Sequence, residues 1–441
     1  MLNVGFICPS SHYLHDPFKG DPHTQLYLLT ILEEKFRDEI NPSLIDLRGI
    51  KRKFAIRQIP ECDIYLHSVY TLDYTEQKSI VRRLRENYPK AKHIAGGPHV
   101  IEFPEESLNL FDSLIIGEGE ESIVQVIDDV MNNKLESVYK QESKIDINAY
   151  PFPLRKYLPK SAVARKDMMT LKSNKEYKEI LGTTTLFSRG CPYNCTFCSM
   201  PQLKQFEKKT RYRKPNLIKD EIKYLQMEYG IRGINLLDEI GIPLNKEKAI
   251  SHLEAIAETG ILWRGQTRVD GFTPEIARLA RDSGCIAMGL GAESASQMAL
   301  DMINKGIKVK RSKKAIRLLK ENNIETRVYL ILGLPGEPRD IVKKTWKFIE
   351  ETKPDLVYLS LFTVRPGTEV YNNPKRFGIK NVDTDWDRTM HLFGRYEDEA
   401  PTLTFEYEEH TPWGRGFSKE ELINNYIELQ SKLRENNMSH V

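Results

Sequence analysis

The sequence of 441 residues lacks long hydrophobic runs: no stretch approaches eighteen uninterrupted apolar residues, so we expect no membrane-spanning helix. It also lacks an excess of one charge, because 65 basic and 62 acidic side chains leave a net charge of +3. A near-neutral chain with no separate RNA-binding module argues against nucleic acid as a partner. Repeats and low-complexity tracts are absent as well. The apolar fraction of 40% and charged fraction of 29% are typical of a globular protein.

Cysteine is scarce, with six in the chain. Cys8, Cys62 and Cys285 lie in apolar strand or helix-end contexts, so we expect buried thiols there. No basic region or small-residue cleavage site accompanies the first segment, Met1–Phe6, which is typical of a strand. We therefore expect a reducing, cytoplasmic setting.

The other three cysteines lie within Cys191-Pro192-Tyr193-Asn194-Cys195-Thr196-Phe197-Cys198, after a β-branched run. Three thiolates are too few for a closed tetrahedral zinc site, which takes four ligands. They suit a [4Fe–4S] cluster held by three cysteines, whose fourth iron stays open. The spacing alone leaves two alternatives, a zinc site that borrows a distant histidine and three ordinary buried thiols.

Apolar and amphipathic segments alternate from residue 1 to about residue 135. We expect strands over Asn3–Cys8, Leu44–Leu47, Asp63–Val69, Lys92–Ala95 and Ser113–Ile116, with helices between them. This alternation predicts an α/β fold with a parallel, doubly wound sheet of the flavodoxin-like kind. Ligands of such sheets bind at the carboxyl ends of strands near the switch point. The loops at Ser68–Tyr70, Gly96–His99 and Gly117–Glu120 would share that edge.

A polar connector, residues 136–182, precedes a second series of strands and helices in residues 183–370. We expect its strands over Thr183–Phe187, Gly233–Asp238, Leu262–Val269, Ile286–Glu293, Thr326–Leu334 and Leu356–Arg365. These units fall short of an eight-stranded barrel, so they predict a partial (β/α)6 barrel with its chemistry at the C-terminal strand ends. Residues 371–441 form a small C-terminal segment. Its aromatic side chains either cap the substrate cavity or form a satellite core: Tyr396, Phe405, Tyr407 and Trp413.

The cysteine loop resembles that of the radical SAM enzymes, whose motif is C-x3-C-x2-C with an aromatic residue, here Phe197, before the last cysteine. The resemblance extends over essentially the whole chain. It implies that Cys191, Cys195 and Cys198 hold a [4Fe–4S] cluster, and that the open iron chelates S-adenosylmethionine and cleaves it reductively to a 5′-deoxyadenosyl radical. It also implies an electron donor, such as a reductase, a flavodoxin or a ferredoxin.

The resemblance assigns S-adenosylmethionine to residues at successive strand ends. Asp238 and Glu239 would accept from the ammonium group; Gln266 and Arg268 would face the reaction space; Glu293 and Ser294 would hold the ribose; Leu334 would back the adenine. From the residue types alone other roles stay open. Asp238 and Glu239 could form a strand-end turn. Arg264 or Arg268 could form a structural ion pair, and Ser294 could be a helix N-cap.

The N-terminal alternation looks like the cobalamin-binding domain that one class of these enzymes carries, with similar glycine turns after its fourth and fifth strands. Cobalamin would then lie over Ser68, Val69, Tyr70, Gly96, Gly97, Pro98, Gly117, Glu118 and Gly119. The Asp-x-His-x-x-Gly motif of better-known cobalamin domains is absent, because Leu26 stands where glycine would follow Asp21-Pro22-His23. We therefore expect no cobalt ligation by His12, His15 or His23.

The resemblance as a whole implies a cobalamin-dependent radical SAM methyltransferase acting on an unactivated carbon. One alternative is a radical rearrangement or cyclisation by the same domains without methyl transfer. Another is an iron–sulfur electron-transfer or carrier module, which would leave the ribose and adenine elements without purpose. The substrate, a small molecule or a peptide or protein, is not identified by the sequence.

Overall fold

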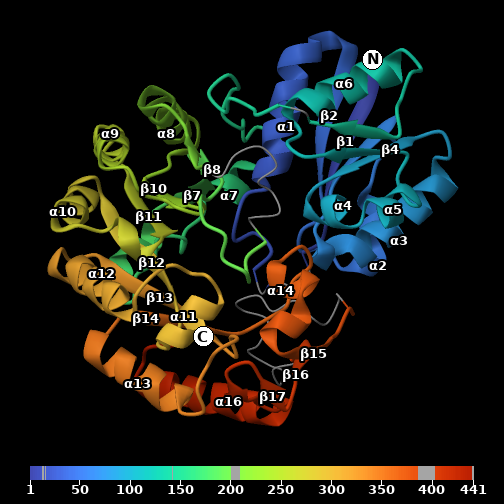
Figure 1. The fold of residues 1–441 in the computed structure, drawn as a ribbon. Helices are drawn as coiled ribbons and strands as arrows, with labels where there is room; N and C mark the ends of the chain where they lie inside the picture. Colours follow the sequence, from blue (N-terminus) through green and yellow to red (C-terminus); the bar gives the residue numbers. More distant parts are fainter. Residues whose placement is uncertain (12–13, 15, 142, 200–208, 386–402, 440–441) are drawn as a thin grey trace. The chain divides into compact units, whose positions relative to one another are not determined.

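The computed structural model describes the chain except residues 12–13, 15, 142, 200–208, 386–402 and 440–441 (Figure 1). The described chain forms two compact units that divide after Val163. We call them the N-terminal unit and the C-terminal unit. Each is built on its own six-stranded sheet. None of the described helices is long and apolar enough to cross a membrane.

The sheet of the N-terminal unit is parallel, with strand order β2-β1-β3-β4-β5-β6. Its strands are β1 Leu2–Cys8, β2 Ile40–Asp46, β3 Ile64–Ser68, β4 Lys92–Gly96, β5 Ser113–Ile116 and β6 Val138–Lys140. The order reverses at β1, as in a doubly wound fold, so the predicted α/β class is confirmed. Strand β6 was not predicted. It has three residues of which only Tyr139 is buried, too short a pattern to stand out in a polar stretch.

Helices cover both faces of this sheet because β1 places apolar side chains on each. Val4 and Phe6 join one core and Ile7 the other. Helix α1 (His23–Phe36) and helix α6 (Glu120–Met131) pack on the first face, and helix α3 (Tyr74–Asn87) packs on the second. The shorter helices of the unit are α2 Arg52–Ala55, α4 Pro98–Glu102, α5 Pro104–Leu108 and α7 Lys160–Val163.

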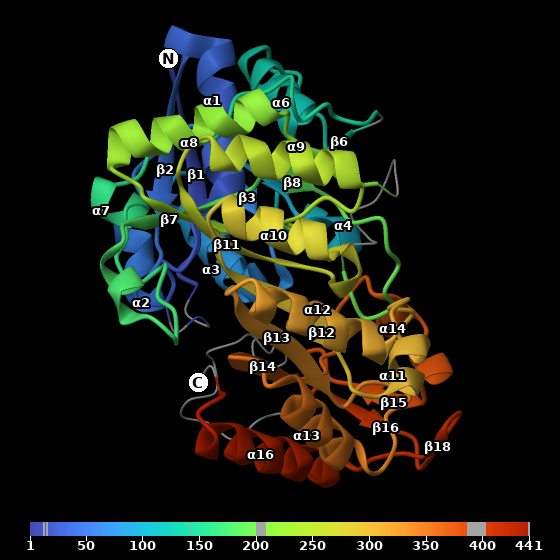
Figure 2. The ribbon, with the colours of Figure 1, turned by 90° about the vertical axis from the view of Figure 1, so that its left-hand side faces the viewer.

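The sheet of the C-terminal unit is also parallel, with strand order β14-β13-β12-β11-β10-β7. Its strands are β7 Gly182–Thr185, β10 Gly233–Leu236, β11 Leu262–Thr267, β12 Cys285–Glu293, β13 Glu325–Leu332 and β14 Leu356–Leu361. Neighbours in the sheet follow one another along the chain, which confirms the predicted partial (β/α)6 barrel. Figure 2 shows its helices as one layer along the sheet: α8 Pro215–Tyr229, α9 Lys246–Ala257, α10 Pro274–Asp282, α12 Val309–Glu321 and α13 Ile341–Thr352.

The barrel strands have one apolar and one polar face. In β14, Val357 and Leu359 are buried against the helices, while Tyr358, between them, is only partly buried. Trp263 and Arg264 of β11 differ in the same way. Because side chains alternate along a strand, the polar ones share the face away from the helices. We call it the inner face, and it carries Asn235, Arg264, Gln266, Arg327, Tyr329 and Tyr358.

The C-terminal segment packs into the barrel core. Strands β15 (Ile379–Val382) and β16 (Phe405–Tyr407) pair antiparallel. The ring of Phe405 meets that of Phe362 edge-on, with centroids 5.3 Å apart. Helix α16 (Lys419–Glu435) begins with a capping box between Ser418 and Glu421. Short elements complete the unit: β8 Ser188–Arg189, β9 Arg211–Tyr212, α11 Gln297–Met302, α14 Glu369–Asn372, β17 His410–Thr411 and β18 Gly414–Arg415.

Both edges of the barrel sheet meet other parts of the chain. At the β14 edge, Val357 N–H donates to the carbonyl of Met438 over 2.8 Å, and Val357 forms a parallel bridge with Ser439. At the β7 edge, Gly182 and Arg165 exchange two backbone hydrogen bonds of 2.8 and 2.9 Å in an antiparallel bridge. Each edge strand is therefore capped by one bridge.

Candidate functional site

The three clustered cysteines lie in the loop that follows β7 and β8. Cys195 is buried, Cys191 and Cys198 are partly buried, and none of the three forms a disulfide within the described residues. The loop is turned by a 3.1 Å hydrogen bond from Cys198 N–H to the carbonyl of Cys195. It is anchored by a 3.0 Å hydrogen bond from Thr196 N–H to the carbonyl of Ile303. A short, anchored loop at a strand end therefore carries all three cysteines.

The donor set of this loop fits an iron–sulfur cube. The loop supplies three cysteines, and each cysteine of a cube binds a different iron. The sulfurs therefore do not need to converge on one point. Within the described residues, no three His, Cys, Asp or Glu side chains are placed to hold a single metal ion.

Arg268 fastens the cysteine loop from the end of β11. Its guanidinium carbon lies 3.4 Å from the ring centroid of Tyr193, and its Nη2 donates to the carbonyl of Lys305 over 2.7 Å. Its Nη1 lies 3.8 Å from the Sγ of Cys195. Asp270 accepts from Arg268 Nε (3.1 Å) and from the Tyr193 hydroxyl (3.0 Å). The structural ion pair that the sequence left open is thus formed, and it also supports the loop.

The charges beside Cys195 favour the form that binds iron. Burial raises the pKa of the Cys195 thiol, whereas the cations of Lys305 and Arg268 lower it. A thiolate is the metal ligand, so nearby cations offset part of the cost of deprotonating a buried thiol.

Asp238, after β10, binds the segment that leads into the cysteine loop. It is 1% exposed, and its carboxylate accepts from Phe187 N–H over 3.1 Å and from the Ser188 hydroxyl. Burial raises the pKa of Asp238 to about 7, and these hydrogen bonds oppose the rise. The structure thus shows Asp238 at the strand-end turn, whereas Glu239 next to it is exposed. A contact between either carboxylate and the ammonium group stays a prediction.

The end of β12 holds a buried ion pair. Glu293 has a φ of +62°, an uncommon conformation for a residue with a side chain. Its Oε1 lies 2.6 Å from the Nζ of Lys305, and both side chains are at most 10% exposed. A Cβ at Gly291 would lie 2.7 Å from that oxygen, so only glycine leaves room for the pair. Lys305 could not be identified from the sequence, because its partner Glu293 lies twelve residues away on another element.

Glu337 connects the two elements expected to hold the ribose and the adenine. It accepts from the Ser294 hydroxyl (3.4 Å) and from Gly333 N–H (2.8 Å). Burial raises the pKa of Glu337 to about 8. Leu334 is buried beside it. Sequence analysis named Ser294 and Leu334 but missed Glu337, although it stands three residues after Leu334 in the same glycine-rich turn.

Gln266 lies on the inner face, two residues before Arg268. It is partly buried, and its backbone carbonyl accepts from Gly241 N–H over 2.9 Å. Arg268 itself is directed to the cysteine loop, as described above. The structure therefore brings Arg268, Glu293 and Ser294 around the loop, with Gln266 deeper in the barrel.

In the N-terminal unit, the glycine turns form one edge of the sheet. Strands β3, β4 and β5 are neighbours, so the segments after them share that edge. Val69 N–H donates to the carbonyl of Gly96 over 2.8 Å, and His99 N–H donates to the carbonyl of Val69 over 3.1 Å. Gly97 has a φ of +102°, and a Cβ there would lie 2.8 Å from the Val69 oxygen. These loops are therefore locked together by backbone contacts.

The remaining predicted residues lie along this edge. Ser68 ends β3, Tyr70 is 47% exposed, and Pro98 opens α4. Glu118, between Gly117 and Gly119, accepts a 3.4 Å hydrogen bond from Ile145 N–H. A backbone-lined edge with few side chains is what a large flat cofactor requires, so the residues present fit a corrinoid.

The histidines near this edge are engaged elsewhere. His99 is fully buried and stacks on Tyr74, with ring centroids 3.9 Å apart. His23 is partly buried near Arg155 and Arg48; burial of its ring, followed by these two cations, lowers its pKa well below the usual range. His12 and His15 lie outside the described residues. The absence of a histidine ligand to cobalt stays a prediction.

Of the named aromatic side chains of the C-terminal segment, Phe405 is a core residue, while Tyr407 and Trp413 are partly buried. Phe405 is 1% exposed, and the Tyr407 hydroxyl donates to the carbonyl of Gly333 over 2.9 Å. Trp413 meets Tyr407 edge-on, with centroids 5.6 Å apart. Tyr396 lies outside the described residues. These contacts match the satellite-core alternative, and the capping role stays a prediction.

Comparison with known proteins agrees with this geometry. Residues 185–349 match the Radical SAM superfamily. The chain therefore carries a radical SAM domain over these residues and is a radical SAM enzyme. The family implies a [4Fe–4S] cluster and S-adenosylmethionine as cofactors.

Individual relatives are more specific. An uncharacterized methyltransferase of Pyrococcus horikoshii is 29% identical over 80% of this chain and 78% of its own length. The anaerobic magnesium-protoporphyrin IX monomethyl ester cyclase of Rubrivivax gelatinosus is 33% identical over 42% of this chain, which spans only 33% of that relative. The structure of the radical SAM methyltransferase TsrM of Kitasatospora setae, with cobalamin and a [4Fe-4S] cluster bound, has a TM-score of 0.65 and 16% identity over 86% of this chain and 79% of its own. At that identity the likeness is one of fold.

Proposed function

We propose that the protein is a cobalamin-dependent radical SAM methyltransferase that methylates an unactivated carbon. The observation that carries the proposal is a chain that joins a radical SAM barrel to a doubly wound unit whose glycine turns form one strand-end edge, locked by backbone hydrogen bonds. The Pyrococcus horikoshii relative, which is named a methyltransferase, supports it because it matches 80% of the chain.

When bound, the cluster supplies the electron that cleaves S-adenosylmethionine, and cobalamin supplies the methyl carrier. The described residues position the segments that would bind these cofactors. Arg268 fixes the cluster loop through Tyr193 and Asp270. Glu337 fixes Ser294 and Gly333, the elements proposed for the ribose and the adenine. The electron comes from a donor such as a flavodoxin or a ferredoxin, in a reducing compartment.

A radical cyclisation without methyl transfer is the second candidate. The observation that favours it is the cyclase of Rubrivivax gelatinosus, at 33% identity. The two candidates differ in one product. In methyl transfer, S-adenosylmethionine gives up its methyl group and becomes S-adenosylhomocysteine, whereas a cyclisation does not form this product.

The test is anaerobic reconstitution with iron, sulfide and hydroxocobalamin, followed by incubation with S-adenosylmethionine and a strong reductant. We expect about one corrinoid per chain. We also expect both 5′-deoxyadenosine and corrinoid-dependent S-adenosylhomocysteine. Deoxyadenosine without S-adenosylhomocysteine, in protein that retains corrinoid, would favour cyclisation or rearrangement. Failure to retain any corrinoid would contradict the proposal.

A further inference from the structure

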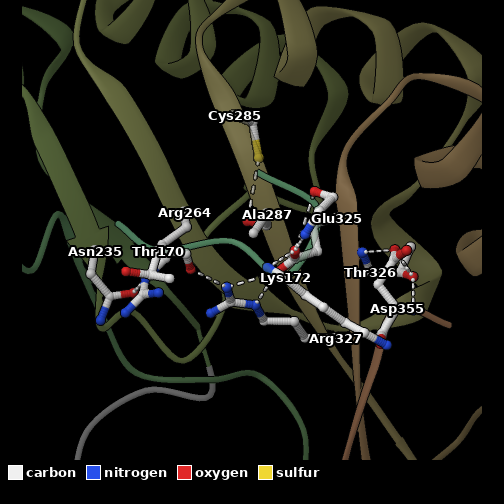
Figure 3. A network of polar contacts seen from close by, with 11 residues as sticks. Thr170, Lys172, Asn235, Arg264, Cys285, Ala287, Glu325, Thr326, Arg327 and Asp355 are labelled. Atoms are coloured by element: carbon white, nitrogen blue, oxygen red, sulfur yellow. Dashed lines mark hydrogen bonds and ion pairs between the residues drawn. The ribbon is translucent and has the colours of Figure 1, made fainter. Parts of the chain in front are cut away.

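The inner face of the barrel carries an arginine, Arg264, that forms no ion pair with any of the described acidic residues. Arg264 Nε donates to the side-chain oxygen of Asn235 over 3.2 Å, and this is its one hydrogen bond within the described part of the chain (Figure 3). A neutral amide leaves most of the guanidinium donors unused, since the group has five. A partly buried cation with so few partners is costly to fold, so its presence calls for a function.

The other arginines near Arg264 are neutralised. Arg327 donates to the carboxylate of Glu325 over 2.7 and 3.0 Å and to the carbonyl of Thr170 over 3.0 Å (Figure 3). Arg268 is paired with Asp270. Arg264 differs from both, because its hydrogen bond in the described part of the chain goes to a neutral amide.

The surroundings of Arg264 hold it charged but poorly solvated. Burial and the nearby cation of Arg327 lower the pKa of Arg264 to about 10, and the weaker effects of Tyr358, Tyr329 and Glu325 oppose the fall. Arg264 therefore stays protonated at neutral pH, and its poorly solvated positive charge would attract an anion. The rings of Tyr329 and Tyr358 lie on the same face, with centroids 5.2 Å apart. Tyr329 also covers Gly289, where a Cβ would lie 2.5 Å from its hydroxyl oxygen.

The depth of Arg264 separates it from the S-adenosylmethionine residues. It precedes Arg268 by four residues on β11, or roughly 13 Å at 3.3 Å per residue. The cysteine loop, Glu293 and Ser294 all lie at the C-terminal strand ends. A group bound to Arg264 would therefore sit below the cofactor residues, inside the barrel.

We propose that Arg264 binds a carboxylate of the substrate, so that the substrate of this enzyme is an organic acid that enters the barrel carboxylate first. The planar guanidinium fork matches a carboxylate in bidentate geometry. A phosphate dianion would need a second unpaired cation, and Arg327 is already paired with Glu325. The proposal rests on the proposed function only in that it names the substrate class of the same barrel.

The first test uses acetate as the carboxylate probe on the full chain. Chloride is replaced by 0.1 M acetate at constant ionic strength, and the melting temperature is recorded. We expect a rise of about 2 °C for the wild-type protein, none for Arg264→Gln and less than half for Arg264→Lys. The control is Arg317→Gln, which removes the same charge from an arginine whose side chain is 68% exposed on α12. A rise that Arg264→Gln retains, or an equal rise with phosphate, would overturn the proposal.

The second test asks whether Arg264 is merely structural. Removing an unpaired, desolvated charge should leave the melting temperature in chloride unchanged or higher, in Arg264→Gln and in Arg264→Met. A marked fall in both variants would show a structural role and overturn the proposal. A weaker affinity for S-adenosylmethionine in Arg264→Gln would also overturn it, because the carboxylate would then be that of the cofactor.

The two proposals fail separately. Formation of S-adenosylhomocysteine without an acetate effect would remove only the carboxylate site. An acetate effect without S-adenosylhomocysteine would leave the site in place and remove methyl transfer.

Discussion

The two sheets have the same number of parallel strands but use their faces differently. Strand β3 of the N-terminal unit is buried at every residue, whereas β14 of the C-terminal unit alternates between buried and partly buried residues. A strand order that reverses sends helices to both faces, and a consecutive order keeps them on one. The N-terminal unit therefore offers a ligand only its strand ends, while the barrel also offers a polar face.

This difference separates two kinds of binding. Strand ends present backbone groups and glycines, as at Gly96 and Gly97. They can bind a large cofactor mainly through the backbone, with few side-chain contacts. The inner face presents fixed side chains, such as Arg264 and Tyr329, and can select a small group by charge. We make four predictions from this difference: three concern strand ends of the two units, and the fourth concerns a helix outside both sites.

The largest effect is expected at the cysteine loop. Replacing Cys191, Cys195 or Cys198 by alanine should abolish the cluster absorbance and the formation of 5′-deoxyadenosine, because a cube loses one of three protein ligands. Cys285→Ala is the control, since that thiol is buried in the core of the same unit. It should keep the cluster and lose only packing energy. A Cys195→Ala variant that keeps its iron and activity would refute the assignment.

The next effect is expected at the strand ends of the N-terminal unit. Gly97→Ala should lower the free energy of unfolding by about 3 kcal/mol, because its positive φ is unfavourable and the new Cβ meets the Val69 backbone. Corrinoid retention should fall with it. Gly230→Ala is the control, with a φ of +67° and nothing within 4 Å of the added Cβ. It should cost about 1 kcal/mol, as urea titration would show; equal costs would contradict the locked edge.

A smaller, pH-dependent effect is expected at Glu337. Its pKa is raised from 4.5 to about 8 in the folded protein, so the folded state binds the proton more tightly than the unfolded state. The resulting stability is fully present below pH 4.5 and is lost as the pH rises through about 8. Glu337→Gln should flatten the fall of the melting temperature of the cofactor-free protein between pH 5 and 9. An unchanged slope would show that this carboxyl does not titrate as its burial implies.

The smallest effect is expected outside both sites. Lys432→Ala on α16 removes a 2.6 Å ion pair with Glu428 one turn earlier. Exposed pairs at this spacing contribute about 0.3–0.5 kcal/mol, so the unfolding free energy should change by no more than that. Cluster content and corrinoid retention should be unaffected. A larger loss would mean that helix α16 depends on this pair.

The fold could be predicted because the apolar patterns of its strands and of its helices are both strong. Apolar runs such as Val4–Cys8 and Val328–Leu332 fix the strands, and glycine turns mark their ends. Strand β6 could not be predicted, since its pairing with β5 depends on backbone hydrogen bonds in place of an apolar pattern.

The candidate site could be predicted only where residues cluster along the chain. Cys191, Cys195 and Cys198 do, and their loop was found. Lys305 and Glu337 act on residues of other elements, Glu293 and Ser294, so only the folded chain brings them together. Phe405 illustrates the same limit. An aromatic residue in an acidic stretch gives no sign that it fills the core beside Phe362.

The bridges at the two edges of the barrel sheet bear on how the protein behaves at high concentration. An open sheet exposes unpaired backbone groups on its outer strands, and these are templates for pairing between molecules. Here Met438 and Ser439 pair with the outer edge of β14, and Arg165 pairs with the outer edge of β7. A chain shortened before Met438 would leave Val357 N–H without its acceptor and would open that strand to a second molecule. Self-association and loss of solubility, rather than loss of catalysis, would be the first sign of such a truncation.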